Sequence, residues 1–415
     1  MLLNKMMQLH AAINYLRCKN SILIMLLFCT ACKTTQPVVQ SPQQHIPIAT
    51  KPDVKTDSVI PKEIEKQKNI LNLGYIMPFY FETNALPILT DDKPTIEPQS
   101  LSALSFFQGA QLAIDSFTNE NLKVVCNAYD LADSTLSLKI TNDKQVNNND
   151  FIFTTSLAPL RELLIQSPTP KYFCIQPVAI AHKNLAVCQP TNQAMIKQLA
   201  LFIAEKNMPV AIIFRNQKKE KELAKWIQTE IDSALSFKNS LYKTSMFDHS
   251  SLKQQVLQKL DKQQKSIVLI ASNDEAFIAP LIHEMASDNK LKIQIIGLPT
   301  WENYESLSFT DLQLLQTIIF NNDYLNFKDL EIQKLRKTFI NKYKCDLSYP
   351  SYQGFYLTKN ILLNYIQIKT EWGNQKLQEV LNGHTFKFSS NQPFNGYFNT
   401  ETYFLLYNNF SLQKQ

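Results

Sequence analysis

The chain has 415 residues, of which 45% are hydrophobic and 11% aromatic. This composition excludes disorder of the whole chain, and the length exceeds what one hydrophobic core usually serves, so two lobes are expected. The 42 lysines and arginines exceed the 36 acidic residues by only six, which gives no indication of a nucleic-acid partner.

The N-terminal segment has the features of a bacterial lipoprotein signal. Basic residues without acidic ones precede a run of about ten apolar residues, about half of what crosses a bilayer, and the run ends in Thr-Ala-Cys. We expect residues 1–31 to be removed and Cys32 to carry the lipid. The alternative is an ordinary signal peptide or a short membrane anchor, because Cys29 rather than leucine stands three positions before Cys32.

Residues 32–69 are expected to form an extended tether, since prolines recur there among Gln, Thr and Lys with little periodic apolarity. The tether would hold the folded body away from a membrane that faces the periplasm. The residue after Cys32 is Lys33 and not an acidic sorting residue, which slightly favours the outer membrane. Removal of residues 1–31 removes three basic residues and leaves the mature chain with a net charge near +3.

From residue 70 onward, short β-rich runs alternate with amphipathic segments, which predicts parallel sheets with crossover helices. The first lobe is expected to contain strands at 71–80, 122–129, 151–155 and 171–177, and helices at 101–117 and 157–166. The second is expected to contain strands at 210–215, 241–246, 267–272 and 293–298, and helices at 192–206, 218–235, 252–264 and 275–287. After Trp301 the pattern predicts a strand at 316–321, helices near 330–343 and 352–372, and β-like pieces at 385–388 and 403–407. We therefore assign residues 70–190 with about 316–382 to lobe 1, and 191–315 with about 383–415 to lobe 2.

No catalytic or metal centre is indicated. The five histidines of the mature chain lack metal-ligand spacing and hydrolase motifs, and no two of the seven glycines are spaced as in a phosphate-binding loop. We expect neither an enzyme nor a cofactor. Four cysteines follow Cys32: Cys126, Cys174, Cys188 and Cys345. Cys174 and Cys188 lie on successive apolar runs and can pair in an oxidising compartment, but buried free thiols fit equally well.

Several motifs carry a family resemblance. Residues 73–79 (LGYIMPF) form a strand that ends in a proline-containing loop, and residues 106–115 (FFQGAQLAID) form a helix whose glycine suits close packing on a sheet. Tyr129-Asp130 ends the second strand, and an aromatic helix near 339–343 precedes Pro350 and Gly354-Phe355-Tyr356. In this order the motifs resemble the type I periplasmic binding proteins, the leucine-binding-protein-like family, over roughly residues 70–412. The resemblance implies two doubly wound α/β lobes with a hinge; another doubly wound α/β fold is the alternative.

Three departures from the pattern of that family put a conventional amino-acid site in doubt. Thr154-Thr155-Ser156 stands where Gly-Pro followed by serine is common, and the region 131–149 is short. Gly354-Phe355-Tyr356 lacks the usual aspartate.

Ligands of open α/β sheets bind beyond the carboxyl ends of the strands, so the residues after each strand are the candidate ligand-binding residues. They are Phe79, Tyr80, Thr154, Thr155, Ser156 and Gln176, with Pro177, in the first lobe, and Arg215, Asn216, Ser272, Glu275 and Trp301, with Asn273, in the second. Thr155 and Ser156 can hold a carboxylate, as the corresponding loop of the family does, or Ser156 can cap the helix that follows.

The charged candidates also have two interpretations. Arg215 can pair with an acidic ligand and Glu275 with an amine. Alternatively, Arg215 is one more cation on a solvated loop beside Lys218, and Ser272 with Glu275 forms a capping box.

The favoured function is a membrane-anchored periplasmic solute-binding lipoprotein that closes two lobes on a small polar ligand, amino-acid-like or peptide-like. A transporter permease would then be a further partner. The alternative is a non-catalytic protein-interaction lipoprotein with the same fold, similar to outer-membrane lipoproteins that activate peptidoglycan synthases. An open polar cleft would favour the first function and a cleft filled with bulky side chains the second. An envelope hydrolase is disfavoured because no nucleophile and base pair is visible.

Overall fold

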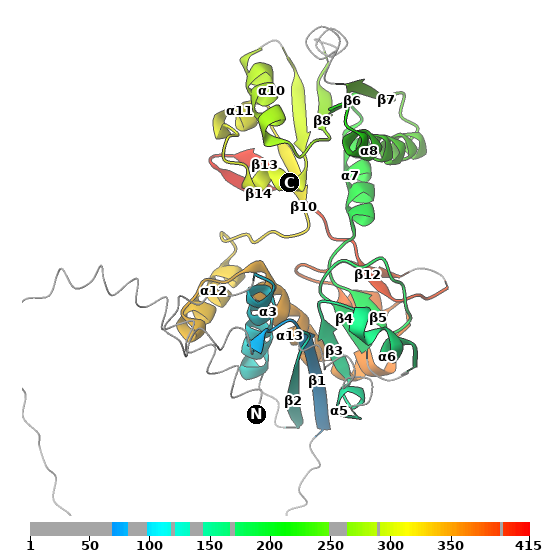
Figure 1. The fold of residues 1–415 in the computed structure, drawn as a ribbon, viewed down its shortest axis with the longest axis vertical. Coiled ribbons are helices and arrows are strands. Elements are labelled where there is room, and N and C mark those ends of the chain that lie inside the picture. The colour runs from blue at the N-terminus through cyan, green and yellow to red at the C-terminus, as the bar shows by residue number, and fades with distance from the viewer. Residues whose placement is uncertain are drawn as a thin grey trace, which may run out of the picture.

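The computed structural model describes residues 69–81, 98–117, 121–132, 144–166, 171–248, 264–288, 291–390 and 393–415. The expected signal peptide, Cys32 and nearly all of the tether lie outside the described residues, as does almost the whole helix expected at 252–264. The described residues form two α/β lobes that follow one another along the long axis of the molecule (Figure 1).

The first lobe is built on a seven-stranded sheet with the order β11-β12-β5-β4-β3-β1-β2. Its strands are β1 (Asn69–Met77), β2 (Leu122–Asp130), β3 (Phe151–Thr154), β4 (Lys171–Cys174), β5 (Leu185–Val187), β11 (Phe388–Ser390) and β12 (Tyr397–Asn399). All neighbours run parallel except β11 and β12. Its helices are α3 (Pro98–Ser116), α5 (Lys144–Asn147), η1 (Ala158–Leu160), α6 (Arg161–Gln166), α12 (Leu330–Tyr343), α13 (Tyr349–Thr370) and α14 (Leu377–Leu381).

The second lobe is built on a seven-stranded sheet with the order β14-β13-β10-β9-β8-β6-β7. Its strands are β6 (Val210–Phe214), β7 (Thr244–Asp248), β8 (Ser266–Ile270), β9 (Ile293–Gly297), β10 (Ile318–Asn321), β13 (Tyr403–Asn408) and β14 (Ser411–Lys414). Only β13 and β14 run antiparallel to their neighbours. Its helices are α7 (Asn192–Lys206), α8 (Lys218–Phe237), α10 (Glu275–Ser287), η3 (Pro299–Asn303) and α11 (Phe309–Leu314).

The two sheets share one strand order. The parallel strands run β2-β1-β3-β4-β5 in the first lobe and β7-β6-β8-β9-β10 in the second. The order therefore reverses between β1 and β3, and again between β6 and β8. These two switch points are where doubly wound sheets usually bind ligands.

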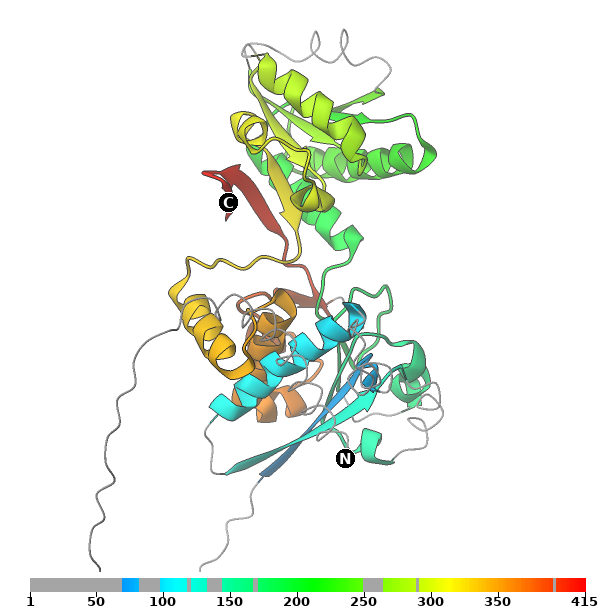
Figure 2. The same ribbon diagram turned by 60° about the vertical axis from the view of Figure 1, so that its left-hand side comes forward.

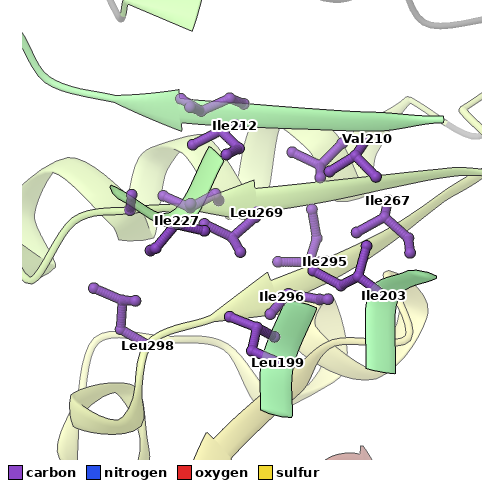
Figure 3. Packing of buried hydrophobic residues seen from close by; sticks show 14 of the residues in the cluster. Leu199, Ile203, Val210, Ile212, Ile227, Ile267, Leu269, Ile295, Ile296 and Leu298 are labelled. Carbon is purple, nitrogen blue, oxygen red and sulfur yellow. The ribbon is translucent and has the colours of Figure 1, made fainter. Parts of the chain in front are cut away.

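The second lobe is held together by aliphatic strands that are buried on both faces. Every residue of β6, β8 and β9 is buried, as expected for runs rich in Val, Ile and Leu at the centre of a parallel sheet. Leu199 and Ile203 of α7 and Ile227 of α8 pack on these strands (Figure 3). Each such side chain contributes about 1.5–3 kcal/mol by its burial.

Two glycines let helices α3 and α13 pack closely in the first lobe. A Cβ at Gly109 would overlap the carbonyl oxygen of Ser351, and one at Gly354 would overlap that of Phe106. The glycine of the first helix therefore packs on another helix, and the expected packing on the sheet was wrong. In Figure 2, α3 (cyan) lies against the yellow and orange helices of the later chain.

The chain passes between the lobes three times, after β5, after β10 and after β12 (Figure 1). These places differ from the expected boundaries. The buried run Ile318-Ile319 continues the second sheet beside β9, so the chain leaves that lobe only after Asn321 instead of near 316. Strands β11 and β12 extend the first sheet beside β5, although residues after about 383 were expected in the second lobe. The local sequence of these short strands did not indicate which of the two sheets each strand joins.

The cysteines of adjacent strands are not bonded to each other. Cys174 on β4 pairs in register with Val187, and Cys188 is the next residue after β5. Because successive side chains of a strand point to opposite faces, the two thiols lie on opposite sides of the sheet, and they pack in different hydrophobic clusters. Cys126, Cys174 and Cys188 carry free thiols.

Candidate functional site

The carboxyl ends of the two sheets face each other across the hinge. The chain leaves the first lobe at the end of β5, which runs parallel to β4. It leaves the second lobe at the end of β10, which runs parallel to β9. Most of the candidate residues therefore lie at the two switch points, on the edges of the lobes that face each other. Their role in ligand binding remains a prediction, and the structure defines what their polar groups already contact.

The loop after β1 is filled by a carboxylate of the protein itself. The backbone N–H groups of Phe79, Tyr80 and Phe81 donate to the side chain of Asp130, with N to O distances of 2.9, 3.1 and 2.8 Å. Tyr80 adopts a left-handed φ of +53°, which helps to point successive amides at one anion. The Phe79 side chain is fully buried and its ring stacks on Phe81. This loop has the form of an anion site, and Asp130 occupies it.

The hydroxyls of the loop after β3 stabilise the loop itself. Thr154 is buried, and its hydroxyl donates to the carbonyl oxygen of Ser156 at 2.8 Å and accepts the N–H of Ser156 at 3.2 Å. The Ser156 hydroxyl accepts the N–H of Ala158, at the start of η1, at 3.4 Å. Thr155 is half-buried, and Gln176, after β4, is exposed. The hydroxyl of Ser156 therefore bonds within its own loop, but the expected cap was wrong, because the N-cap of η1 is Leu157, which makes no side-chain capping bond.

Arg215, after β6, is enclosed by acidic and amide groups of the second lobe. Its guanidinium pairs with Glu220 at 2.5 Å, pairs with Asp274, and donates to Gln217 at 3.1 Å. The hydrogen bonds from Arg215 to Glu220, followed by the charges of both carboxylates, raise the pKa of the arginine. Glu220 also accepts the hydroxyl of Ser272 at 2.9 Å. We call Arg215, Glu220, Ser272 and Asp274 the arginine network.

The cap of α10 is not the expected one. The carboxylate of Asp274 accepts the N–H of Phe277 at 3.2 Å, so Asp274 is the N-cap, whereas Ser272 accepts the N–H of Asp274 itself. Glu275 accepts the N–H and the hydroxyl of Ser306, each at 2.7 Å, and these bonds lower its pKa. The expected capping box of Ser272 and Glu275 was therefore wrong, because Asp274, two positions after Ser272, is the N-cap.

Trp301 is a core residue rather than a surface one. Its side chain is 1% exposed, its ring lies against Gly297, and its indole N–H donates to the carbonyl oxygen of Ser272 at 3.3 Å. The neighbouring Asn273 is exposed, and its side chain accepts the hydroxyl of Thr300 at 2.7 Å. Asn216 is also exposed.

Sequence reasoning missed the residues that occupy the two switch points. Asp130 was noted only as a strand end, and Glu220 and Asp274 were not singled out. A detectable signal existed, since Glu220 follows Arg215 by five residues at the start of a helix and Asp274 directly precedes Glu275. Their convergence depends on the pairing of β6 with β8, which no local pattern specifies.

Within the described part of the chain, two cavities lie away from the switch points. One, of about 420 Å³, is at the hinge and is lined by Glu302, Asp323, Tyr349 and their neighbours. The other, of about 490 Å³, is on the second lobe, where Lys206, Lys265 and several glutamines line it. None of the candidate ligand-binding residues lines either cavity. Among the described residues there is no cluster of three or more metal-ligating side chains, and none of the helices is long and apolar enough to cross a membrane.

Comparison with known proteins supports the fold. No protein-family model and no curated protein matches the sequence. Among solved structures, a putative branched-chain amino acid ABC transporter protein from Rhodospirillum rubrum has a TM-score of 0.55 and 11% identity, covering 83% of this chain and 100% of that one. The C-domain of LpoA from Haemophilus influenzae, a regulator of PBP1A, has a TM-score of 0.53 and 9% identity, covering 83% and 99%. A periplasmic ligand-binding protein of a branched-chain amino acid transporter from Burkholderia xenovorans has a TM-score of 0.52 and 13% identity, covering 81% and 90%.

These similarities confirm the expected fold class, two α/β lobes of the type I periplasmic-binding-protein kind. At such low identities they concern the fold alone. The proteins that share this architecture include a periplasmic ligand-binding protein and a regulator of PBP1A, so the fold by itself assigns no function to this chain.

Proposed function

We propose that this chain is a non-catalytic envelope protein that uses its two lobes to bind a protein partner. The observation that carries the proposal is the internal pairing at both switch points. Asp130 fills the amide loop of the first lobe, and Arg215 is paired with Glu220 and Asp274 in the second. An acidic solute would have to displace these carboxylates, and each charged hydrogen bond that it broke would cost about 1.5–3 kcal/mol.

The partner class that best suits this function is a peptidoglycan synthase. LpoA, which has the same fold, is described as a regulator of PBP1A. We propose that Cys32, once acylated, anchors the chain in a membrane facing the periplasm, with the outer membrane favoured, and that residues 33–68 span the distance to the synthase. Replacement of Cys32 by serine would then abolish the incorporation of labelled fatty acid into the protein.

A solute-binding function is the second candidate. Its support is the fold of two transporter components and the polar residues Gln176 and Asn216, which are exposed at the carboxyl ends of β4 and β6. In this function the lobes would close on an amino acid or a short peptide, and a permease would receive it.

Thermal unfolding with candidate solutes distinguishes the two functions. A ligand at one hundred times its Kd stabilises the native state by about 2.7 kcal/mol, which raises the Tm by several degrees. We expect no rise above 1 °C (about 0.3 kcal/mol) with the amino acids, di- and tripeptides or muropeptides. A larger rise that Thr155→Ala abolishes would overturn the proposal.

The positive test uses purified synthases of the source cell. We expect the soluble chain carrying Cys32→Ser to bind one bifunctional synthase and to change its rate of glycan polymerisation or crosslinking. If it binds none of them and leaves every rate unchanged, the proposed function is wrong.

A further inference from the structure

The hinge cavity has walls from both lobes. It has a volume of about 420 Å³ and lies where the chain leaves β10 for α12. Glu302 of η3 and Leu412 of β14 belong to the second lobe, and Tyr349 begins α13 of the first. Asp323 and Phe327 come from the connecting segment. An occupant would therefore touch both lobes and the segment between them.

Three of the seven residues that line the cavity are aromatic, and two more are leucines. The hydroxyl of Tyr349 donates to the carbonyl oxygen of Asn322 at 2.7 Å, which fixes its ring in the wall. Tyr324 also lines the cavity and contacts Tyr403, with ring centroids 5.8 Å apart. The lining residue Phe327 is 42% exposed, and Leu330, three residues farther along the chain, is 74% exposed.

The cavity carries two negative charges that no cation balances. Glu302 accepts the side-chain amide of Asn321 at 2.8 Å. Within the described part of the chain, neither Glu302 nor Asp323 forms an ion pair. Partial desolvation raises the pKa of both carboxyl groups, and the charge of Asp323 raises that of Glu302 further. A cation placed between them would relieve this repulsion.

Two other carboxylates, by contrast, are paired with cations of the protein. Lys414 pairs with Glu401 at 3.4 Å and also lies 4.7 Å from the centroid of the Tyr403 ring. Arg336 pairs with Asp346 at 2.6 Å while its guanidinium lies 4.9 Å from the centroid of the Phe327 ring. The same combination of a carboxylate and an aromatic ring therefore already holds a cation beside Tyr403 and another beside Phe327.

We propose that this hinge groove docks a basic segment of the partner protein, with a lysine or arginine side chain between Glu302 and Asp323. The proposal rests on the proposed function and names the surface that performs it. A long basic side chain suits the groove because its apolar stem can lie along the aromatic wall while its charge reaches the carboxylates. Apolar neighbours in the same segment would cover Phe327 and Leu330. Since the groove spans the hinge, binding would favour one arrangement of the lobes.

The test measures binding of a probe peptide to the soluble chain carrying Cys32→Ser. The probe is fluorescein-labelled Leu-Arg-Leu-Lys-Leu, and its control has glutamate at both basic positions. The test variant is Glu302→Gln with Asp323→Asn. The matched control, Glu222→Gln with Glu379→Gln, removes two charges from the exposed surfaces of α8 and α14. Thermal unfolding of both variants checks that they are folded.

We expect the basic peptide to bind and the acidic one not to bind. The test variant should weaken binding about tenfold, because the bound basic side chain would lose both of its charged partners, and the control should stay within twofold. Equal affinity in the test variant, or no binding of the basic peptide to the parent chain, would overturn the proposal. Binding that appears only after proteolytic removal of the residues before 69 would also overturn it, since the groove would then hold the tether. A dimer that the parent chain forms and the test variant does not form would overturn it as well, since the groove would then hold a second copy.

Binding of the synthase separates this proposal from the proposed function. If the parent chain binds a synthase and the test variant binds it equally well, the docking surface is wrong and the function stands. If the parent chain binds no synthase, the function itself fails.

Discussion

Replacement of Arg215 by alanine tests whether the arginine network belongs to the fold or to a ligand site. In the structure, Arg215 is the only basic residue paired with Glu220 and Asp274 among the described residues. The Glu220 side chain is 12% exposed, so it could recover little hydration after the change. It would keep the hydroxyl of Ser272 but lose the guanidinium. We therefore expect Arg215→Ala to destabilise the second lobe.

The expected loss lies between two known limits. Fully exposed ion pairs contribute at most about 1 kcal/mol, whereas breaking a buried pair costs about 3–5 kcal/mol. The side chains of Arg215 and Asp274 are 23% and 35% exposed, which places the network between these limits. A loss of about 2 kcal/mol follows.

Urea unfolding followed by tryptophan fluorescence measures this loss. In a Trp372→Phe background the remaining tryptophans, Trp226 and Trp301, both lie in the second lobe, and Trp301 donates to the backbone of Ser272 within the network. Arg336→Ala is the control, because its pair with Asp346 is exposed on both sides and should matter much less. If Arg215→Ala unfolds within about 0.5 kcal/mol of its parent, the spread expected of ordinary surface substitutions, the network does not support the fold. Arg215 would then again be a candidate ligand group.

Three further predictions concern packing, thiols and pH. Gly109→Ala and Gly354→Ala should each cost about 3 kcal/mol by overpacking the contact of α3 with α13, as measured by urea unfolding; near-neutral effects would contradict the close contact. Burial raises the pKa of Cys126 and of Cys174 to about 12, and that of Cys188 well above its usual value, so iodoacetamide should spare all three in the native chain and modify them in urea without reductant. A disulfide found by mass spectrometry would contradict this result. The pair Glu302→Gln and Asp323→Asn should raise the Tm at pH 7.5, and the gain should shrink toward pH 4, because carboxyl groups with raised folded-state pKa values destabilise the fold only once they ionise. A gain that grows on acidification would refute the sign of this effect.

Local sequence patterns predicted many of the elements well, above all in the second lobe. The helices α7, α10 and α12 begin and end where the periodicity placed them, since Thr191, Asp274 and Asp329 supply side-chain caps at their starts. The central strands β6, β8 and β9 of that lobe are mostly aliphatic and fully buried, as a buried parallel sheet requires. Strands β5, β12 and β14 were missed because three or four residues are too few to show a period.

The sequence predicted where in the fold the candidate residues lie, but not what they contact. The rule that ligands bind beyond strand ends directed attention to the switch points, because it follows from topology. Which groups meet there depends on neighbours far away in the chain: Asp130 reaches the amides of 79–81 from another strand, and Asp274 reaches Arg215 across 59 residues. The burial of Phe79 and Trp301 likewise follows from tertiary packing.

These contacts bear on how one fold can serve two functions. Lobe closure on a solute needs groups at the strand ends that gain more from the ligand than from the open protein. Here the amides after β1 and the guanidinium after β6 are already satisfied within their own lobes, so closure offers them little further stabilisation. The uncompensated charge lies instead at the hinge, on Glu302 and Asp323, in a cavity whose walls come from both lobes. Under the proposed function, a partner protein that binds at the hinge gains free energy from these charges, and a small solute at the strand ends does not. We expect this difference of a regulator.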